Sequence, residues 1–185
     1  FHTFFYASFD PAGFITLDKP PVALWIQALS AYLFGLSDFS VLLPEALAGV
    51  ISVWLMYVII KPQFGRKAAL LSSLVLACTP IFVAVVRTNN VDSILIMTLL
   101  VATWSLMKAV EKQKIRWLLL SFFLVGIGFN IKMLQAYMVL PAFYLFYFIA
   151  AKSKWTKRMV QLIAATVVLL VVSLSWATIV DMVPK

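Results

Sequence analysis

Charged side chains are scarce in this sequence: Asp, Glu, Lys and Arg make up 12% of its 185 residues, whereas hydrophobic residues make up 64%. Soluble globular proteins use apolar residues for only about half of the chain, so the composition excludes an ordinary soluble domain. The single cysteine, Cys78, excludes an internal disulfide. The apolar runs also lack the alternation of polar and apolar residues found in outer-membrane barrel strands. These absences predict an all-α membrane protein.

The apolar runs set the expected number of helices, because a helix needs about 20 residues to cross the hydrocarbon layer. Six runs are predicted to be transmembrane helices: residues 41–60, 68–86, 90–110, 117–131, 133–151 and 159–180. The run at residues 22–36 is shorter, and its small or polar residues Ala23, Gln27, Ser30 and Ala31 share one helical face. We therefore expect a juxtamembrane helix at the membrane surface, preceded by an outer loop at residues 1–21.

The basic residues are unevenly distributed between the connecting segments. Eleven of the 15 Lys and Arg residues lie in the connectors at residues 61–67, 108–116 and 152–158, which share one side of the membrane if the helices alternate in direction. The positive-inside rule places that side in the cytoplasm, and it explains the net charge of +8 better than nucleic-acid binding does. If residues 22–36 instead crossed the membrane, Asp18 and Lys19 would move to the cytoplasmic side.

Charges of both signs are expected to gather on the other, extracytoplasmic side. The segment at residues 9–25 supplies Asp10, Asp18 and Lys19, the segment RTNNVD supplies Arg87 to Asp92, and Lys132 ends a predicted helix. Cations bind phosphate, and carboxylates or amides bind hydroxyl groups. The mixture suits a lipid-linked sugar. Two alternatives stay open: the lysines could anchor phospholipid head groups, and Asp92 could cap its own helix.

Three segments, in this order, resemble bacterial members of the glycosyltransferase family 39 group: SFDPAGFITLDKPP, RTNNVD and GFNIKMLQAYMVLP. This group includes protein mannosyltransferases and the aminoarabinose transferases that modify lipid A. The resemblance covers essentially the whole sequence. It implies a GT-C-type helix bundle with juxtamembrane helices in an outer loop. It also implies a polyprenyl-phosphate sugar donor bound at the outer membrane face, with an acceptor hydroxyl that attacks C1 while a carboxylate acts as base.

The resemblance also implies roles for particular residues. Lys19, in the DKPP segment with Asp18, would bind the donor phosphate, and Lys132 and Arg87 would assist it. Asp92 matches an outer-loop acid that positions the acceptor or the head group. The candidate substrate-binding residues are Asp18, Lys19, Arg87, Asn89, Asp92 and Lys132. The catalytic base of the family would precede Phe1, so no catalytic residue is assigned, and we expect the sequence to be a piece of a longer protein.

The predicted function is transfer of a hexose from a polyprenyl-phosphate donor to an unidentified acceptor on the outer side of the plasma membrane. The hexose is expected to be mannose-like or a related sugar. A lipid-linked-sugar flippase and a non-catalytic membrane subunit are the alternatives. The predicted charges sit at helix ends and no inverted repeat is visible, which disfavours a transporter. Carboxylates beside a phosphate could hold Mg²⁺ or Mn²⁺, but the sequence has no dense ligand motif and no metal is assigned.

Overall fold

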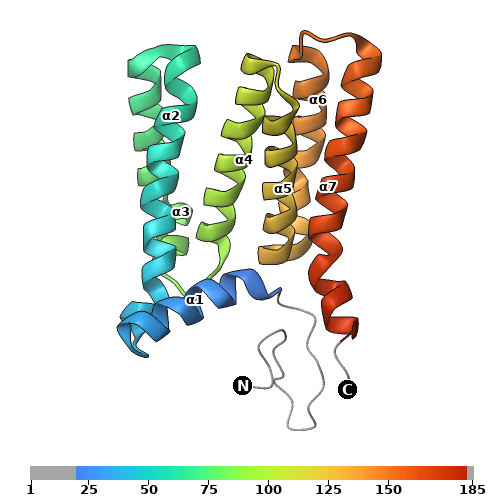
Figure 1. Ribbon diagram of the computed structural model, residues 1–185. Helices are drawn as coiled ribbons and strands as arrows, with labels where there is room; N and C mark the ends of the chain where they lie inside the picture. Colours follow the sequence, from blue (N-terminus) through green and yellow to red (C-terminus); the bar gives the residue numbers. More distant parts are fainter. Residues whose placement is uncertain (1–19, 183–185) are drawn as a thin grey trace.

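The computed structural model describes residues 20–182, so Asp10, Asp18 and Lys19 lie outside the described residues. The described chain is helical apart from short connections, with no strand in this range. Figure 1 shows an upright bundle with one helix lying across its end. The elements in chain order are α1 (Pro21–Phe34), α2 (Asp38–Cys78), α3 (Pro80–Val86), α4 (Asp92–Lys112), α5 (Ile115–Lys132), the 3₁₀ helix η1 (Met133–Val139), α6 (Leu140–Ala150) and α7 (Trp155–Met182).

The crosswise helix is α1, and its ends follow from its sequence. Pro21 occupies the first turn, where a missing N–H costs nothing, and Gly35 ends the helix with a φ of 81° that favours glycine. The face that carries Ala23, Gln27 and Ser30 is buried against the bundle. The short apolar run with one small and polar face therefore forms a helix that packs beneath the others (Figure 1).

Two of the long helical runs fold back on themselves. Four runs are long and apolar enough to cross a membrane. One of them, α2, has 41 residues and would be about 60 Å long if straight. It reverses at Gly65, which has a φ of 82°, and the run Ile115–Ala150 breaks at Met133, which has a φ of 44°. Because two of the four runs are each divided in two, the bundle has six long helical segments. Figure 1 shows α2 turning at the end opposite α1.

The structure differs from the predicted helices at two places. The predicted helix at residues 68–86 is interrupted at Thr79, because Pro80 has no N–H to continue the ladder and instead begins α3. The predicted helix at residues 133–151 begins as the tighter η1 and becomes α-helical only at Leu140. Elsewhere the predicted and observed helix ends differ by a few residues, because helix ends fray and are poorly defined by sequence.

The core lies between α4, α5, α6 and α7, around the fully buried side chains of Leu118, Phe122 and Val125. Close approach of α5 and α7 depends on Gly126, where a Cβ would lie 2.9 Å from the Cβ of Val172. Small residues allow such contacts between membrane helices. Hydrogen bonds add to the packing: Asn130 Nδ2 donates to the Val172 carbonyl at 2.8 Å, which joins α5 to α7.

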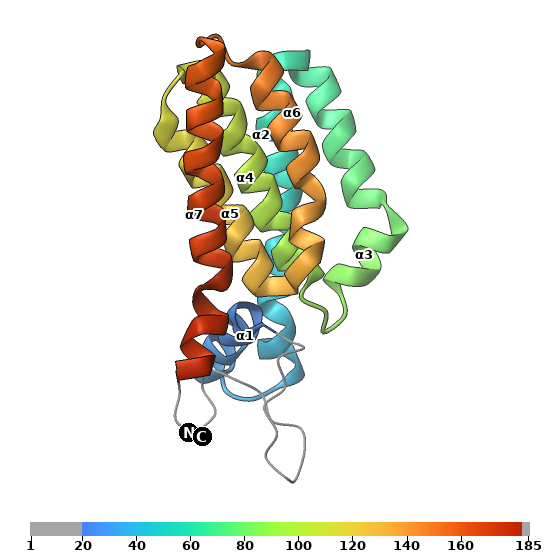
Figure 2. The ribbon, with the colours of Figure 1, turned by 90° about the vertical axis from the view of Figure 1, so that its right-hand side faces the viewer.

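The two ends of the bundle carry different segments. The end of the bundle that α1 crosses holds the connection between α3 and α4 and the junction of α5 with η1 (Figures 1 and 2). The opposite end holds the turn of α2 and the connections from α4 to α5 and from α6 to α7, which are the basic segments. We call these the α1 end and the basic end.

Candidate functional site

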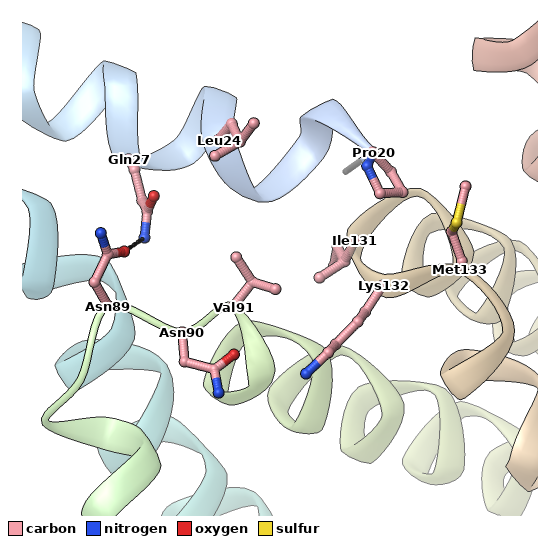
Figure 3. Close-up of a pocket in the computed structure, with 9 residues that line it drawn as sticks. All are labelled: Pro20, Leu24, Gln27, Asn89, Asn90, Val91, Ile131, Lys132 and Met133. Atoms are coloured by element: carbon pink, nitrogen blue, oxygen red, sulfur yellow. Dashed lines mark hydrogen bonds between the residues drawn. The ribbon is translucent and has the colours of Figure 1, made fainter. Parts of the chain in front are cut away.

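A cavity of about 320 Å³ lies at the α1 end, between α1, the segment before α4, and the end of α5. Figure 3 shows its lining, with α1 on one side and the two bundle segments on the other. The polar lining side chains are Gln27, Asn89, Asn90 and Lys132, and the rest of the lining is largely apolar: Pro20, Leu24, Val91, Ile131 and Met133. A few polar groups on an apolar wall are typical of a ligand site.

Lys132 forms the cationic side of the cavity. Its Nζ donates to Asp92 Oδ1, and the Asn90 Nδ2 donates to the other oxygen of the same carboxylate at 3.0 Å. The Lys132 and Asp92 side chains are 32% and 25% exposed, so the pair is only partly screened by solvent. In Figure 3 the Lys132 side chain extends toward Asn90. A cation, a carboxylate and an amide thus meet within one hydrogen-bonded group.

The end of α5 positions Lys132 through an unusual backbone turn. Lys132 is the last residue of α5, and the next residue, Met133, has a φ of 44°. A non-glycine residue in that region is disfavoured, and such residues often occur at binding sites, where the surrounding packing enforces them. A broken helix at membrane depth is tolerated where it lines a cavity. The break ends the helix at the cavity and leaves Lys132 on its wall.

Gln27 joins α1 to the bundle at the other side of the cavity. Its Nε2 donates to Asn89 Oδ1 at 2.9 Å, a bond between residues 62 positions apart in the chain. Gln27 is 8% exposed, so loss of the bond would leave a buried amide without this partner. The bond fixes α1 over the segment that leads into Asp92.

A second cavity, of about 450 Å³, lies beside the ion pair. It includes Asp92 and Gln135, and its other lining residues, from α2, α3, α4 and η1, are mainly apolar: Leu76, Thr79, Ile81, Phe82, Val85, Leu95, Ile96 and Met138. Lys132 lines the first cavity and Asp92 the second. The ion pair therefore stands between a mixed polar space and an apolar one.

Glu45 is a buried carboxylate near the same end. It lies in α2 with 0% exposure, close to Gln27, Ser93 and the backbone amide of Ile94. Neither carboxylate oxygen meets hydrogen-bond geometry with a described residue, and the Ser93 hydroxyl is likewise unpaired. Uncompensated burial of a charged group is costly. From the sequence, Glu45 was identified only as a carboxylate near the start of a helix. An acidic residue inside an apolar run is itself a signal of function, and this signal could have identified it.

The structure brings three of the six candidate substrate-binding residues together. Asn89 and Lys132 line the cavity, and Asp92 holds Lys132. Arg87 is exposed and does not line the cavity. Asp18 and Lys19 lie outside the described residues. Gln27, Asn90 and Glu45 were not singled out as site residues.

The alternative role of Asp92 as a helix cap is not seen in the structure. The N-cap position of α4 is Val91, and no side chain caps the helix there. The Asp92 carboxylate instead accepts from Lys132 and Asn90, while its place in the first turn still favours a negative charge. Asn130, another amide of this end, is occupied by the Gly126 and Val172 carbonyls. In residues 20–182, no three His, Cys, Asp or Glu side chains lie close enough to hold a metal ion.

The bundle with its crosswise helix resembles a solved structure. The crystal structure of ArnT from Cupriavidus metallidurans in the apo state matches 91% of this chain with a TM-score of 0.69 and 22% sequence identity, and the chain covers 32% of that protein. The chain therefore has the GT-C-type fold of ArnT.

Sequence similarity then defines the family. Residues 18–176 match the dolichyl-phosphate-mannose-protein mannosyltransferase family, and the chain belongs to it. It is 62% identical to the "Putative mannosyltransferase YkcB" of Bacillus subtilis (strain 168) over 184 residues, which is all of this chain. It is 55% identical to the "Putative mannosyltransferase YycA" of the same strain over 181 residues, which is 98% of this chain. The chain spans 26% of each of these two relatives.

Proposed function

We propose that this chain is part of a membrane glycosyltransferase that moves a hexose from a polyprenyl-phosphate donor to an acceptor on the extracytoplasmic face. The observation that carries the proposal is the Lys132 and Asp92 pair between a polar cavity and an apolar one. Family membership and the names of the Bacillus relatives support a mannosyl or related sugar. The acceptor is a glycan, lipid or protein with a free hydroxyl.

In this proposal the donor lies across the ion pair. Its phosphate competes with Asp92 for Lys132 Nζ, its sugar meets the amides of Asn89 and Asn90 in the polar cavity, and its polyprenyl chain enters the apolar cavity. A charge-assisted bond from lysine to phosphate is among the stronger hydrogen bonds. When the sugar is transferred, Lys132 stabilises the negative charge that develops on the departing phosphate.

Asp92 keeps Lys132 in place when the donor is absent, and it accepts from a sugar or acceptor hydroxyl when the phosphate has displaced it. Lys19, Asp18 and Arg87 remain proposed donor ligands. The carboxylate that would deprotonate the acceptor is proposed to lie in a part of the full-length protein beyond this chain.

The test uses the full-length protein, reconstituted with a radiolabelled polyprenyl-phosphate hexose and assayed for sugar transfer. Lys132→Ala and Asp92→Asn are compared with Lys108→Ala and Glu111→Gln, which disrupt the ion pair at the basic end. Loss of transfer in the first two variants alone supports the proposal. Equal activity in all four variants would remove the site, and movement of intact donor across the bilayer without transfer would favour the flippase.

A further inference from the structure

The structure holds a third cavity, at the basic end, which the proposed function does not use. It has a volume of about 560 Å³ and is lined by residues of the connection between α4 and α5, of the first turn of α5 and of the first two turns of α7: Gln113, Lys114, Ile115, Arg116, Lys157, Val160 and Gln161. Three of its seven lining residues are cations and none is acidic. We propose that this basic cavity binds the head group of an anionic phospholipid.

Two basic residues near the cavity are occupied by contacts within the protein. Lys108 is paired with Glu111 at 2.7 Å. Arg158 donates to the carbonyls of Phe148 and Ser153, which occupies it in capping the end of α6. By contrast, Lys114, Arg116 and Lys157 form no ion pair with a described residue, although the Arg116 guanidinium lies over the Trp117 ring, 5.8 Å from its centroid.

The walls of the basic cavity are fixed by hydrogen bonds. Gln113 has a left-handed backbone, and its side chain donates to the Val110 carbonyl and accepts from the Lys152 backbone N–H at 3.2 Å. This ties the two neighbouring connections together. Gln161 is 8% exposed and accepts from the Tyr147 hydroxyl at 2.8 Å, which leaves its amide NH₂ without a described partner. The amide NH₂ of this largely buried residue thus adds a hydrogen-bond donor to the three cations.

Helix ends strengthen the positive potential. The cavity contains the start of α5, which has neither an acidic residue in its first turn nor a side-chain cap, and α7 likewise has no acidic residue in its first turn. Backbone N–H groups at such starts are unpaired within the helix and favour anions. An anionic group such as a phosphate suits both the cations and the helix starts.

An apolar stripe on α7 favours a lipid over free phosphate. It begins at the cavity with Val160, which is 65% exposed, and continues along one helical face through Ile163, Val167, Val171 and Leu174, each more than half exposed. A phosphate held by the cations would place an acyl chain along this stripe. Basic pockets between transmembrane helices bind anionic lipid head groups in this way.

The experiment titrates the purified full-length protein with phosphatidylglycerol and, separately, with phosphatidylcholine, and counts bound lipid by native mass spectrometry. The test variant carries Lys114→Gln, Arg116→Gln and Lys157→Gln. The matched control carries Lys61→Gln, Arg66→Gln and Lys67→Gln, which remove the same charge from the α2 turn at the same end. Basic residues that contact an anionic head group strengthen its binding, so we expect affinity for phosphatidylglycerol to fall by more than about tenfold in the test variant and by less than about twofold in the control, whose residues do not line the cavity.

An equal fall in both variants would overturn the proposal, because it would reflect the charge of the whole end. An unchanged affinity in the test variant, or equal binding of phosphatidylcholine by the wild type, would also overturn it. Inorganic phosphate that displaces the lipid at equal concentration would reassign the cavity to a free anion. If the triple variant does not elute as the folded protein, Lys114→Gln with Lys157→Gln keeps the contact of Arg116 with the Trp117 ring and must still weaken binding several-fold.

Discussion

The two ends of this helix bundle carry charge in different ways. At the basic end, cations crowd the connectors, and the one described ion pair, Lys108 with Glu111, joins neighbours on a single helix. At the α1 end, Lys132 and Asp92 come from different helices, 40 positions apart in the chain, and they meet beside two cavities. Charge of one sign in connectors reports orientation in a membrane, whereas opposite charges brought together from distant segments indicate a site.

The strongest test of this difference is removal of the cation at each end. Lys132→Ala removes a group that would neutralise the departing phosphate, so we expect sugar transfer to fall by about a hundredfold. Lys108→Ala, which removes the paired lysine of the basic end, should keep transfer within about twofold of wild type. The measurement is initial transfer rate at saturating donor. Similar losses in both variants would show that the two ends do not differ in function.

A smaller effect is expected when the carboxylates are changed. Asp92→Asn keeps the size of the side chain but no longer holds Lys132 by charge, and we expect kcat/KM for the donor to fall by about tenfold. Glu111→Gln at the basic end is the control, and it should leave kcat/KM unchanged because exposed ion pairs contribute little. A loss in the control as large as that in Asp92→Asn would contradict this expectation.

A still smaller effect should follow from loosening α1. Gln27→Leu removes the bond to Asn89 and leaves α1 less firmly held over the cavity, so KM for the donor should rise by about threefold to tenfold with little change in kcat. Gln113→Leu removes comparable hydrogen bonds at the basic end and should change neither constant. An effect of Gln27→Leu on kcat alone would assign Gln27 to the chemical step.

How far the sequence predicts this molecule depends on what each feature requires. The helical membrane fold, the crosswise α1 and its buried face follow from run lengths and from the spacing of Ala23, Gln27 and Ser30. The sequence also predicts that the RTNNVD segment and Lys132 lie at the same end of the bundle, because successive helices alternate in direction. None of these requires knowledge of how a helix is rotated about its axis.

The individual contacts do require that rotation. The bond of Gln27 to Asn89 and the pairing of Lys132 with Asp92 depend on which faces of α1, α4 and α5 oppose each other. Periodicity predicts an apolar face but not its partner. The exposed position of Arg87 was missed because the turn at that helix end is set by tertiary packing. The break before Pro80 was missed although the sequence signals it, because a proline inside an apolar run has no N–H for the helical ladder.

The smallest predicted effect concerns Glu45, the carboxylate that the α1 end buries. Glu45→Gln keeps the shape and removes the cost of a buried charge, so we expect the free energy of unfolding to stay within about 1 kcal/mol of wild type or to increase. Thermal unfolding of the full-length protein in detergent measures this. Glu111→Gln, at a side chain that is 63% exposed, gives the matched baseline. A strong loss of stability in Glu45→Gln alone would mean that the charged form has a partner in the folded protein.

The central claim is that the α1 end faces the outside and binds the donor. It is tested most directly by Asn89→Cys in the full-length protein with its other cysteines replaced, expressed in intact cells and labelled with a membrane-impermeant maleimide. We predict labelling from outside, slowed by added polyprenyl-phosphate sugar, and Gln113→Cys labelled only after permeabilisation. Labelling of Asn89→Cys only from the cytoplasm, or at a rate that the donor does not change, would contradict the account.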